Sequence, residues 1–180
     1  MSESLTDSEL LVLGLVSEMP RHGYELEQII EQRGMREWTQ IGFSSIYFVL
    51  GKLEKKGLVT AEKPAGMKAK KSYLMTEAGQ QALITQTLSA LTTVRPTYSS
   101  LLMGMIHWPA LQREQALDAL NQRSKAIQEE ITRIEGIQLD QQPLPDHVDA
   151  LFDYSIAQLK SEADWLQKTL DYMTCKPWNT

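Results

Sequence analysis

The sequence has few of the features on which secreted, membrane-bound and disulfide-linked proteins depend. Its 180 residues include one cysteine, Cys175, which excludes an internal disulfide framework. No apolar run reaches the roughly 18 residues that a membrane-spanning helix needs. The apolar stretch near the N-terminus has no basic region before it and acidic residues on both sides, which disfavours a secretory signal. We therefore expect a cytoplasmic protein that is not associated with a membrane.

Motifs for catalysis and for metal or cofactor binding are also missing. His22, His107 and His147 are scattered, and none has a Cys or Asp nearby at the spacing of metal ligands. The sequence contains no glycine-rich phosphate loop, nucleophile elbow or paired-carboxylate signature. We therefore expect no enzymatic activity, no bound metal and no cofactor.

Positive charge is scarce overall but concentrated in one segment. The chain has 18 Lys and Arg against 23 Asp and Glu, a formal net charge of −5. Residues 52–71 contain seven lysines and two glutamates, so this segment carries +5 and the remainder −10. A short lysine run is often only solvated surface. The alternative is an anion-binding patch whose acidic surroundings limit unspecific contacts.

Two helices are expected before residue 35. Thr6 and Glu9 have the spacing of a capping box at the start of an apolar run, which predicts a helix over 7–18. A second helix is expected over 23–33. Gly34 follows it where a left-handed C-terminal cap belongs.

A third helix is expected to begin near Ser44, a suitable N-cap, and to close at Gly57. Its buried face is predicted by three apolar residues at helical spacing: Ile46, Leu50 and Leu53. Two β-prone runs follow, 58–61 and 72–75, on either side of a turn rich in Pro, Gly and Lys. Three helices followed by a β-hairpin predict a winged helix-turn-helix, in which a helix enters the major groove.

The outward face of the third helix is the candidate DNA-contacting surface. Ser44 and Ser45 lie at the helix start, where free amides and the helix dipole attract phosphate, although Ser44 can equally be only an N-cap. Lys52 lies further along the helix. Tyr47 and Phe48 cannot both face inward at this spacing, so we expect one in the core and the other exposed.

From residue 77 onward the sequence is helical in character. Two apolar stripes with alternating spacings of three and four follow one another, separated by an expected loop over 136–145. They predict an antiparallel helical hairpin. The fold class is therefore mostly α, with a winged-helix DNA-binding domain over 1–85 and an all-α dimerisation domain over 86–180.

The sequence resembles the PadR family of bacterial transcriptional regulators. The resemblance lies in "HGYELEQIIEQRGM" at 22–35, "SSIYFVLGKLEKKGLVTAE" at 44–62 and "KKSYLMTEAGQQAL" at 70–83. It implies a homodimeric repressor that binds palindromic double-stranded DNA and releases it on meeting a small molecule, often a phenolic or other aromatic compound. By matching positions, Ser45 and Tyr47 would contact DNA from the helix, with Lys70, Lys71 and Tyr73 on the wing. The full candidate DNA-binding set is Ser44, Ser45, Tyr47, Phe48, Lys52, Lys68, Lys70, Lys71 and Tyr73.

Three residues in or next to the third helix, Gly42, Phe43 and Gly51, are unexpected for a DNA-contacting helix. Gly42 and Phe43 precede the helix where more polar residues are expected. Gly51, inside the helix, costs about 1 kcal/mol relative to Ala. Close approach to a backbone is one explanation for this glycine, and simple tolerance is another.

An aromatic effector is expected to bind between the two halves. Aromatic and methionine side chains suit flat, variable ligands, although each of these residues is more often part of an ordinary core. The candidates are Trp38, Tyr98, Met103, Met105 and Trp108.

The homodimer is expected to form through the C-terminal helices. The two stripes can satisfy one another within a chain, but Leu151, Phe152 and Trp165 lie outside them and still need burial. An intramolecular three-helix bundle is the alternative. The expected interface residues are Ile156, Leu159, Trp165, Leu166, Leu170 and Met173.

Two other functions remain open from the sequence. One is a winged-helix adaptor for protein–protein contact, which has no need of the local +5 charge. The other is a small-molecule carrier built from the helical half, which would bind a ligand without binding DNA.

Overall fold

The computed structural model describes residues 4–39, 41–42, 45–62, 71–96 and 98–176. The chain forms two compact units, residues 1–96 and 97–180. The boundary expected between residues 85 and 86 falls inside a helix of the first unit, and as a functional boundary it stays a prediction. Among the described residues, no helix is both long and apolar enough to cross a membrane.

The first unit contains four α-helices in its described part, and three of them have the predicted signals at their ends. Helix α1 (Asp7–Glu18) begins with the predicted capping box, in which the Thr6 hydroxyl accepts from the Glu9 amide. Helix α2 (Gly23–Gln32) is followed by Gly34, which adopts a left-handed conformation with φ of 60°. Helix α3 (Ser45–Lys55) is followed by Gly57 with φ of 70°. Helix α4 (Glu77–Thr92) completes the set.

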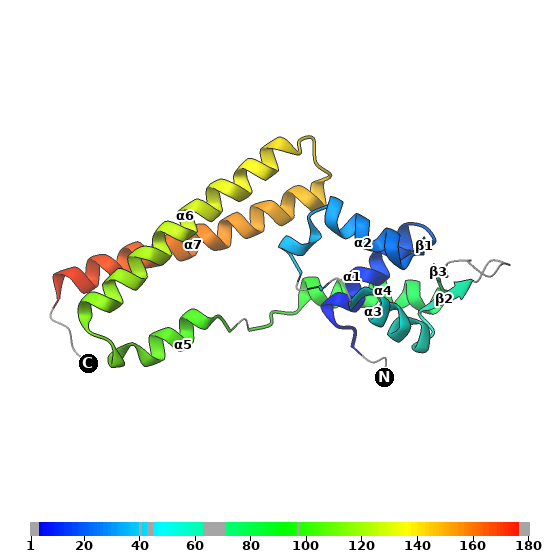
Figure 1. Cartoon of the computed structure of the whole chain (residues 1–180), viewed down its shortest axis with the longest axis horizontal. Helices are drawn as coiled ribbons and strands as arrows, with labels where there is room; N and C mark the ends of the chain where they lie inside the picture. The colour runs from blue at the N-terminus through cyan, green and yellow to red at the C-terminus, as the bar shows by residue number, and fades with distance from the viewer. Residues whose placement is uncertain (1–3, 40, 43–44, 63–70, 97, 177–180) are drawn as a thin grey trace. The chain divides into compact units, whose positions relative to one another are not determined.

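A three-stranded antiparallel sheet in the order β1-β3-β2 forms the wing side of this unit (Figure 1). Strands β2 (Val59–Glu62) and β3 (Ser72–Met75) form the predicted hairpin. Strand β1 (Arg21–His22) pairs with β3 and was not predicted, because two residues are too few to show an alternating pattern. The sheet therefore ties the segment before α2 to the wing.

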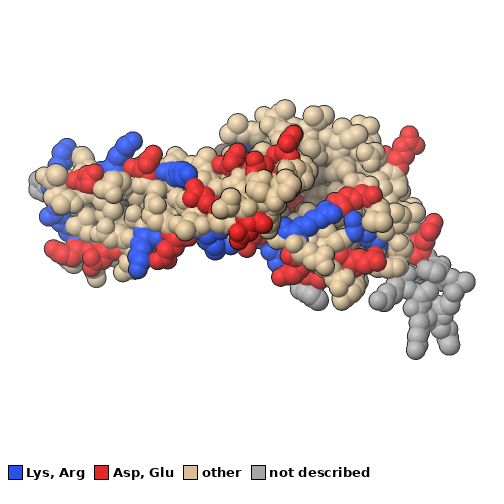
Figure 2. All heavy atoms as spheres, turned by 90° about the horizontal axis from the view of Figure 1, so that it is seen from above, with Lys and Arg blue, Asp and Glu red and all other residues tan. Residues whose placement is uncertain are grey.

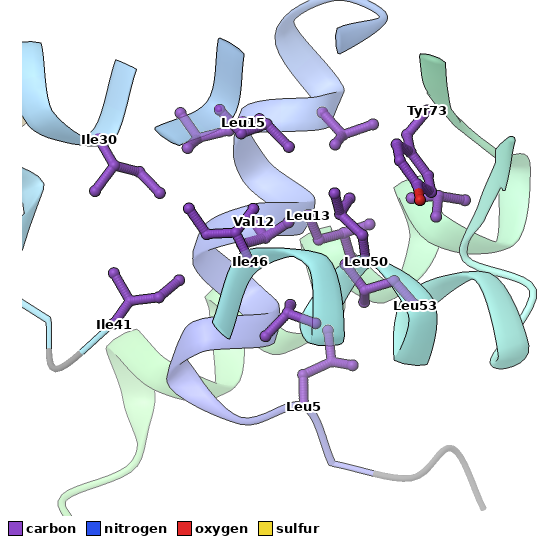
Figure 3. Close-up of a cluster of buried hydrophobic side chains, with 14 residues drawn as sticks. Leu5, Val12, Leu13, Leu15, Ile30, Ile41, Ile46, Leu50, Leu53 and Tyr73 are labelled. Carbon is purple, nitrogen blue, oxygen red and sulfur yellow. The ribbon is translucent and has the colours of Figure 1, made fainter. Parts of the chain in front are cut away.

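The core of the first unit lies between α1, α2, α3 and the sheet. Figure 3 shows Ile46 and Leu50 of α3 facing Val12 and Leu13 of α1. These four side chains are completely buried, as is Leu53, which confirms the predicted inward face of α3. Burial of this kind stabilises the unit by roughly 1.5–3 kcal/mol for each large side chain.

The second unit contains a short helix and a long helical hairpin. Helix α5 (Ser100–His107) precedes α6 (Arg113–Asp140) and α7 (Asp146–Cys175). Helices α6 and α7 run side by side in opposite directions, as predicted (Figure 1). The expected loop over 136–145 is wrong in its first half, because α6 continues through Gly136 to Asp140. A helix tolerates a single glycine when the flanking residues favour helix, as they do here.

Candidate nucleic-acid interface

The outward face of α3 is set by the residues that it buries. Ile46, Val49, Leu50 and Leu53 face the core, so the opposite side of the helix faces solvent. Lys52 and Lys55 both lie exposed on that side, without an acidic partner among the described ion pairs. Two cations and a helix face free of core contacts suit an anionic partner such as a nucleic-acid backbone.

The expectation that one of Tyr47 and Phe48 lies in the core is wrong. Tyr47 is 57% exposed and Phe48 is 65% exposed. Val49, which is 5% exposed, lies on the buried face of α3 instead of an aromatic ring. At 100° per residue, Val49 lies about 60° to one side of Ile46 and Leu50 about 40° to the other, so these three residues form the buried face and both rings lie outside it.

Tyr47 nevertheless has a fixed neighbour on α2. A Cβ added at Gly23 would lie 2.6 Å from the Tyr47 ring, which is closer than such contacts occur. Gly23 therefore leaves the space in which the ring lies against the α2 backbone. The position of the Tyr47 ring on α3 therefore depends on Gly23, the first residue of α2.

The connection between α2 and α3 is held by Arg36. Its guanidinium pairs with Glu27 and Glu31 of α2, and its Nε donates to the carbonyl of Ile41 at 3.4 Å. Glu27 is only 7% exposed, and its hydrogen bond with Arg36 raises the pKa of the guanidinium. Arg36 thus fixes the turn that leads into α3.

The exit from the wing is held by Thr76 and Gly79. The Thr76 hydroxyl donates to the carbonyl of Gly57 at 2.8 Å and accepts from the Gly79 amide at 2.9 Å. A Cβ at Gly79 would lie 2.0 Å from the carbonyl oxygen of Leu58. Thr76 and Gly79 therefore hold the start of α4 against Gly57 and Leu58, the residues that follow α3.

The wing lysines are only partly described. Lys68 and Lys70, like Ser44 at the start of the recognition helix, lie outside the described residues. Lys71 is exposed, and its ammonium is 3.2 Å from a carboxylate oxygen of Glu54. The Lys71 carbonyl lies 2.9 Å from Nδ1 of His22, so the base of the wing is anchored to the segment before α2.

Tyr73 does not lie on the surface of the wing as expected. It is 7% exposed and belongs to the core cluster of the first unit. Figure 3 shows its ring at one side of this cluster. Tyr73 lies on the central strand β3, where one of the two alternating faces is turned to α1, so its side chain packs inward.

Lys56 belongs to the positively charged segment, but its ammonium pairs with a buried carboxylate. Its ammonium lies 3.0 Å from a carboxylate oxygen of Glu9, which is only 2% exposed. Burial raises the pKa of Glu9, but hydrogen bonds from the Thr6 amide and Lys56, with the lysine's charge, bring it below its ordinary value. This pair ties the start of α1 to the end of α3, and the sequence showed no sign of it.

The predicted effector residues are divided between the two units. Trp38 follows a short 3-10 helix (Met35–Glu37) in the first unit and is partly buried. Met103 and Met105 lie on α5, where Met103 is 51% exposed, and Tyr98 precedes that helix and is 83% exposed. Trp108 packs against the core of the α6–α7 hairpin. Each unit therefore offers aromatic or methionine surface, and an effector site built from both stays a prediction.

A hollow of about 420 Å³ lies within the first unit, between α1, α4 and the segment around Met35. The sequence analysis did not identify it. Leu10, Leu11 and Leu83 give it apolar walls, whereas Asp7 and Glu18 add two carboxylates. Glu18 is already paired with Arg21 and Arg33, so the mainly apolar walls suit an apolar group.

The predicted dimer residues are mostly used within the hairpin of a single chain. Leu166 is fully buried, and Ile156, Leu170 and Met173 are between 5% and 8% exposed. Leu159 and Trp165 are partly buried against the same cluster. Phe152, expected to need a partner, is 5% exposed, whereas Leu151 is 43% exposed. Contact of this set with a second copy stays a prediction.

The α6–α7 hairpin carries charges of both signs rather than a cluster of one sign. Figure 2 shows basic and acidic side chains interspersed over this unit on the face that it displays. Two of the described pairs join the two helices, Arg123 with Glu162 at 2.5 Å and Lys160 with Glu135 at 2.7 Å. Mixed and paired charge of this kind does not form an anion-binding surface, so the first unit is the better candidate for contact with nucleic acid.

Comparison with known families identifies the first unit. Residues 12–85 match the model of the transcriptional regulator PadR-like family. No curated protein sequence matches the chain.

Solved structures match over nearly the whole chain. Bacillus subtilis PadR in complex with operator DNA has a TM-score of 0.72 and 20% identity, covering 92% of this chain and 98% of that one. The same protein in complex with p-coumaric acid has a TM-score of 0.73 and 19% identity over 92% and 98%. The PadR-like transcriptional regulator BC1756 from Bacillus cereus has a TM-score of 0.66 and 20% identity over 95% and 100%.

At these identities the likeness to the solved structures concerns the fold. The winged helix followed by long helices is shared, and the expected fold class is confirmed. With the family match over residues 12–85, the expected resemblance is confirmed as well. Residues 12–85 thus match the model of the PadR-like family of transcriptional regulators, and the chain shares its fold with PadR.

Proposed function

We propose that the protein is a homodimeric transcriptional repressor that binds palindromic DNA and is released by a small aromatic molecule. The observation that carries the proposal is the outward face of α3 in a PadR-like domain. Lys52, Lys55, Tyr47 and Phe48 are exposed there and contribute nothing to the core. A recognition helix presents such a face to the major groove.

The wing supports the same function. Lys71 directly precedes β3, at the turn end of the hairpin, and Lys68 and Lys70 precede it in the sequence. A lysine is a flexible point charge, which favours phosphate contact over base readout. We therefore assign phosphate contact to the wing and base contact to α3. The solved structure of PadR in complex with operator DNA supports contact with DNA by this fold.

A dimer is supported by exposed apolar side chains on the long helices. Leu151 and Tyr154 of α7 are 43% and 64% exposed, although both are large hydrophobic residues near the start of the helix. A symmetric dimer would also place two recognition helices about one turn of DNA apart, which requires a palindromic site.

The effector is supported by the fold and by the chemistry of exposed side chains. PadR was crystallised with p-coumaric acid, a phenolic compound. Met103 and Tyr98 offer the kind of polarizable and aromatic surface that binds flat ligands. We infer that a small aromatic compound, bound next to α5, weakens the affinity for DNA.

Selection from random DNA tests the central claim. We expect the protein to enrich a palindromic sequence, and the double variant Lys52→Ala/Lys55→Ala to bind it at least tenfold more weakly. Lys125→Ala is the matched control, because Lys125 is an exposed lysine of α6 in the other unit. A protein that enriches no sequence would be an adaptor or a carrier instead.

Sedimentation equilibrium tests the dimer. We expect twice the chain mass of 20.4 kDa for the wild type and a shift toward the monomer for Leu151→Glu. Leu139→Glu changes a leucine at the end of α6 that is 74% exposed, and it serves as the control. A wild-type monomer at micromolar concentration would contradict the dimer.

Titration with phenolic acids tests the effector. We expect a change in tryptophan fluorescence and release of labelled DNA at the same concentrations. Met103→Glu should reduce both responses while leaving DNA binding in the absence of the compound unchanged. If no aromatic compound alters either signal, the regulator has no effector of this class.

A further inference from the structure

An exposed aromatic ring and a missing side chain lie next to each other on the outward face of α3. Phe48 is 65% exposed although it is a large hydrophobic residue. Gly51 follows it three residues later, where the next side chain along the same face of a helix would lie. Lys52 follows it by four residues, and its ammonium lies 4.7 Å from the centre of the Phe48 ring.

Packing within the described part of the chain explains neither the exposure of Phe48 nor the presence of glycine at position 51. Phe48 points away from the core formed by Ile46 and Leu50. A Cβ built at Gly51 meets no atom within 4 Å, so no described neighbour requires the glycine. Glycine in a helix interior is nevertheless unfavourable relative to alanine. A partner molecule that closely approaches this face of α3 would account for both the exposed Phe48 ring and the glycine at position 51.

We propose that Phe48 recognises the C5-methyl group of a thymine in the major groove, and that Gly51 leaves the space for that base to reach the ring. The proposal rests on the DNA binding proposed above. The thymine methyl is the apolar group that base edges display in the major groove, and phenylalanine is one of the side chains that contact it. The first turns of a recognition helix are the part that reaches base edges, and Phe48 lies in the first turn of α3.

The neighbouring charges favour DNA over an apolar protein partner. Lys52 and Lys55 are exposed on the same face, so the ring lies in a positively charged environment. The cation–π contact with Lys52 also restrains the ring before binding. Restraint of this kind reduces the entropy that is lost when the contact forms.

Replacement of thymine by deoxyuridine in the selected operator tests the contact, because it removes only the methyl group. We expect one replacement in each half-site to weaken wild-type binding by about fifteenfold, because two methyl groups are removed and each buried methyl-sized group contributes about fourfold. Phe48→Ala should bind the unmodified operator more weakly and should not respond to that replacement. This non-additivity is the sign of a direct contact.

Tyr172→Ala is the matched control. Tyr172 is 59% exposed on α7, and Lys176 lies 4.3 Å from its ring, so the same kind of pair is removed in the other unit. We expect this variant to keep both the affinity and the response to deoxyuridine. Thermal melts should show all three proteins folded, because the rings removed are exposed.

Gly51→Ala tests the second half of the proposal. The added methyl fits the free protein, so the melting temperature should rise, whereas the affinity for the operator should fall by at least tenfold. Unchanged affinity would overturn the role of Gly51. A Phe48→Ala variant that responds to deoxyuridine like the wild type would overturn the methyl contact while leaving DNA binding intact. Failure of the wild type to bind any DNA would overturn the proposed function and this inference together.

Discussion

The two units of the chain bury their apolar side chains to different extents. In the first unit, Leu13, Leu26, Ile46 and Leu53 are completely buried by helices and a sheet that cover them from several sides. In the second unit, most core residues of the α6–α7 hairpin remain 5–8% exposed, and Leu166 alone is completely buried among those described. Two helices can cover only one side of each other. The first unit therefore encloses its core more fully than the described part of the second unit does.

The largest difference between the units should appear when core side chains are shortened. Leu53→Ala removes a completely buried side chain and should lower the free energy of unfolding of the first unit by about 2–5 kcal/mol. Leu159→Ala removes a partly buried side chain of the hairpin seam and should cost less than half as much. Urea unfolding followed by circular dichroism measures both. Equal losses would show that the hairpin is packed as tightly as the winged helix.

Glycine replacements should have opposite effects in the two units. Gly79→Ala would place a methyl group 2.0 Å from the Leu58 carbonyl oxygen and 2.5 Å from the Met75 sulfur. We expect it to destabilise the first unit by about 1–3 kcal/mol or more, because the backbone must move. Gly136→Ala adds a methyl in open space within α6 and should stabilise the second unit by up to about 1 kcal/mol.

Thermal melts of the two glycine variants, compared with the wild type, would measure both changes. A neutral Gly79→Ala would contradict the close contact between the wing exit and α4.

Acid should weaken the first unit through the buried pair of Glu9 and Lys56. The pKa of Glu9 is lowered in the folded state. Its contribution to stability is therefore complete above the unfolded value, about 4.3, and is lost as the pH falls through the lower folded value. Glu9→Gln should cost about 1–3 kcal/mol at pH 7, and this cost should shrink below pH 4.

Glu130→Gln is the control in the second unit. The hydrogen bond from Arg133 lowers the pKa of Glu130, but both side chains are 42% exposed. Solvent screens such a pair, so we expect a loss of about 0.5 kcal/mol or less. Urea unfolding at pH 3, 4 and 7 measures both variants. If Glu9→Gln lowered the free energy of unfolding equally at all three pH values, the negative charge of Glu9 would not contribute to stability.

The smallest effects should come from single lysines, and they should appear only in DNA binding. Lys71→Ala and Lys70→Ala should each reduce the slope of log affinity against log salt by about 0.9 for each phosphate that the lysine neutralises. Site preference should stay the same, because a lysine–phosphate pair carries no sequence information. Lys125→Ala in the second unit should leave the slope unchanged. Fluorescence anisotropy at several salt concentrations checks this. An unaltered slope in both wing variants would make these lysines solvated surface.

The sequence by itself determined the features that depend on near neighbours. The Thr6 capping box, the glycine caps at Gly34 and Gly57, three of the four inward residues of α3 and the two seams of the hairpin were predicted. Each arises from contacts within a turn or two of helix, so a short pattern contains the necessary information. Of these features, Gly34, Gly57 and the inward face of α3 also lie within the segments that carry the family resemblance, 22–35 and 44–62.

Only the tertiary structure decided which side chains meet across the chain. It placed Tyr73 in the core, left both Tyr47 and Phe48 exposed, and paired Lys56 with Glu9, 47 positions earlier in the sequence. Strand β1 forms because β3 lies beside it, and α6 passes Gly136 because nothing there ends it. A local pattern is blind to such pairings, since the energy of a contact depends on groups that folding brings together from distant parts of the chain.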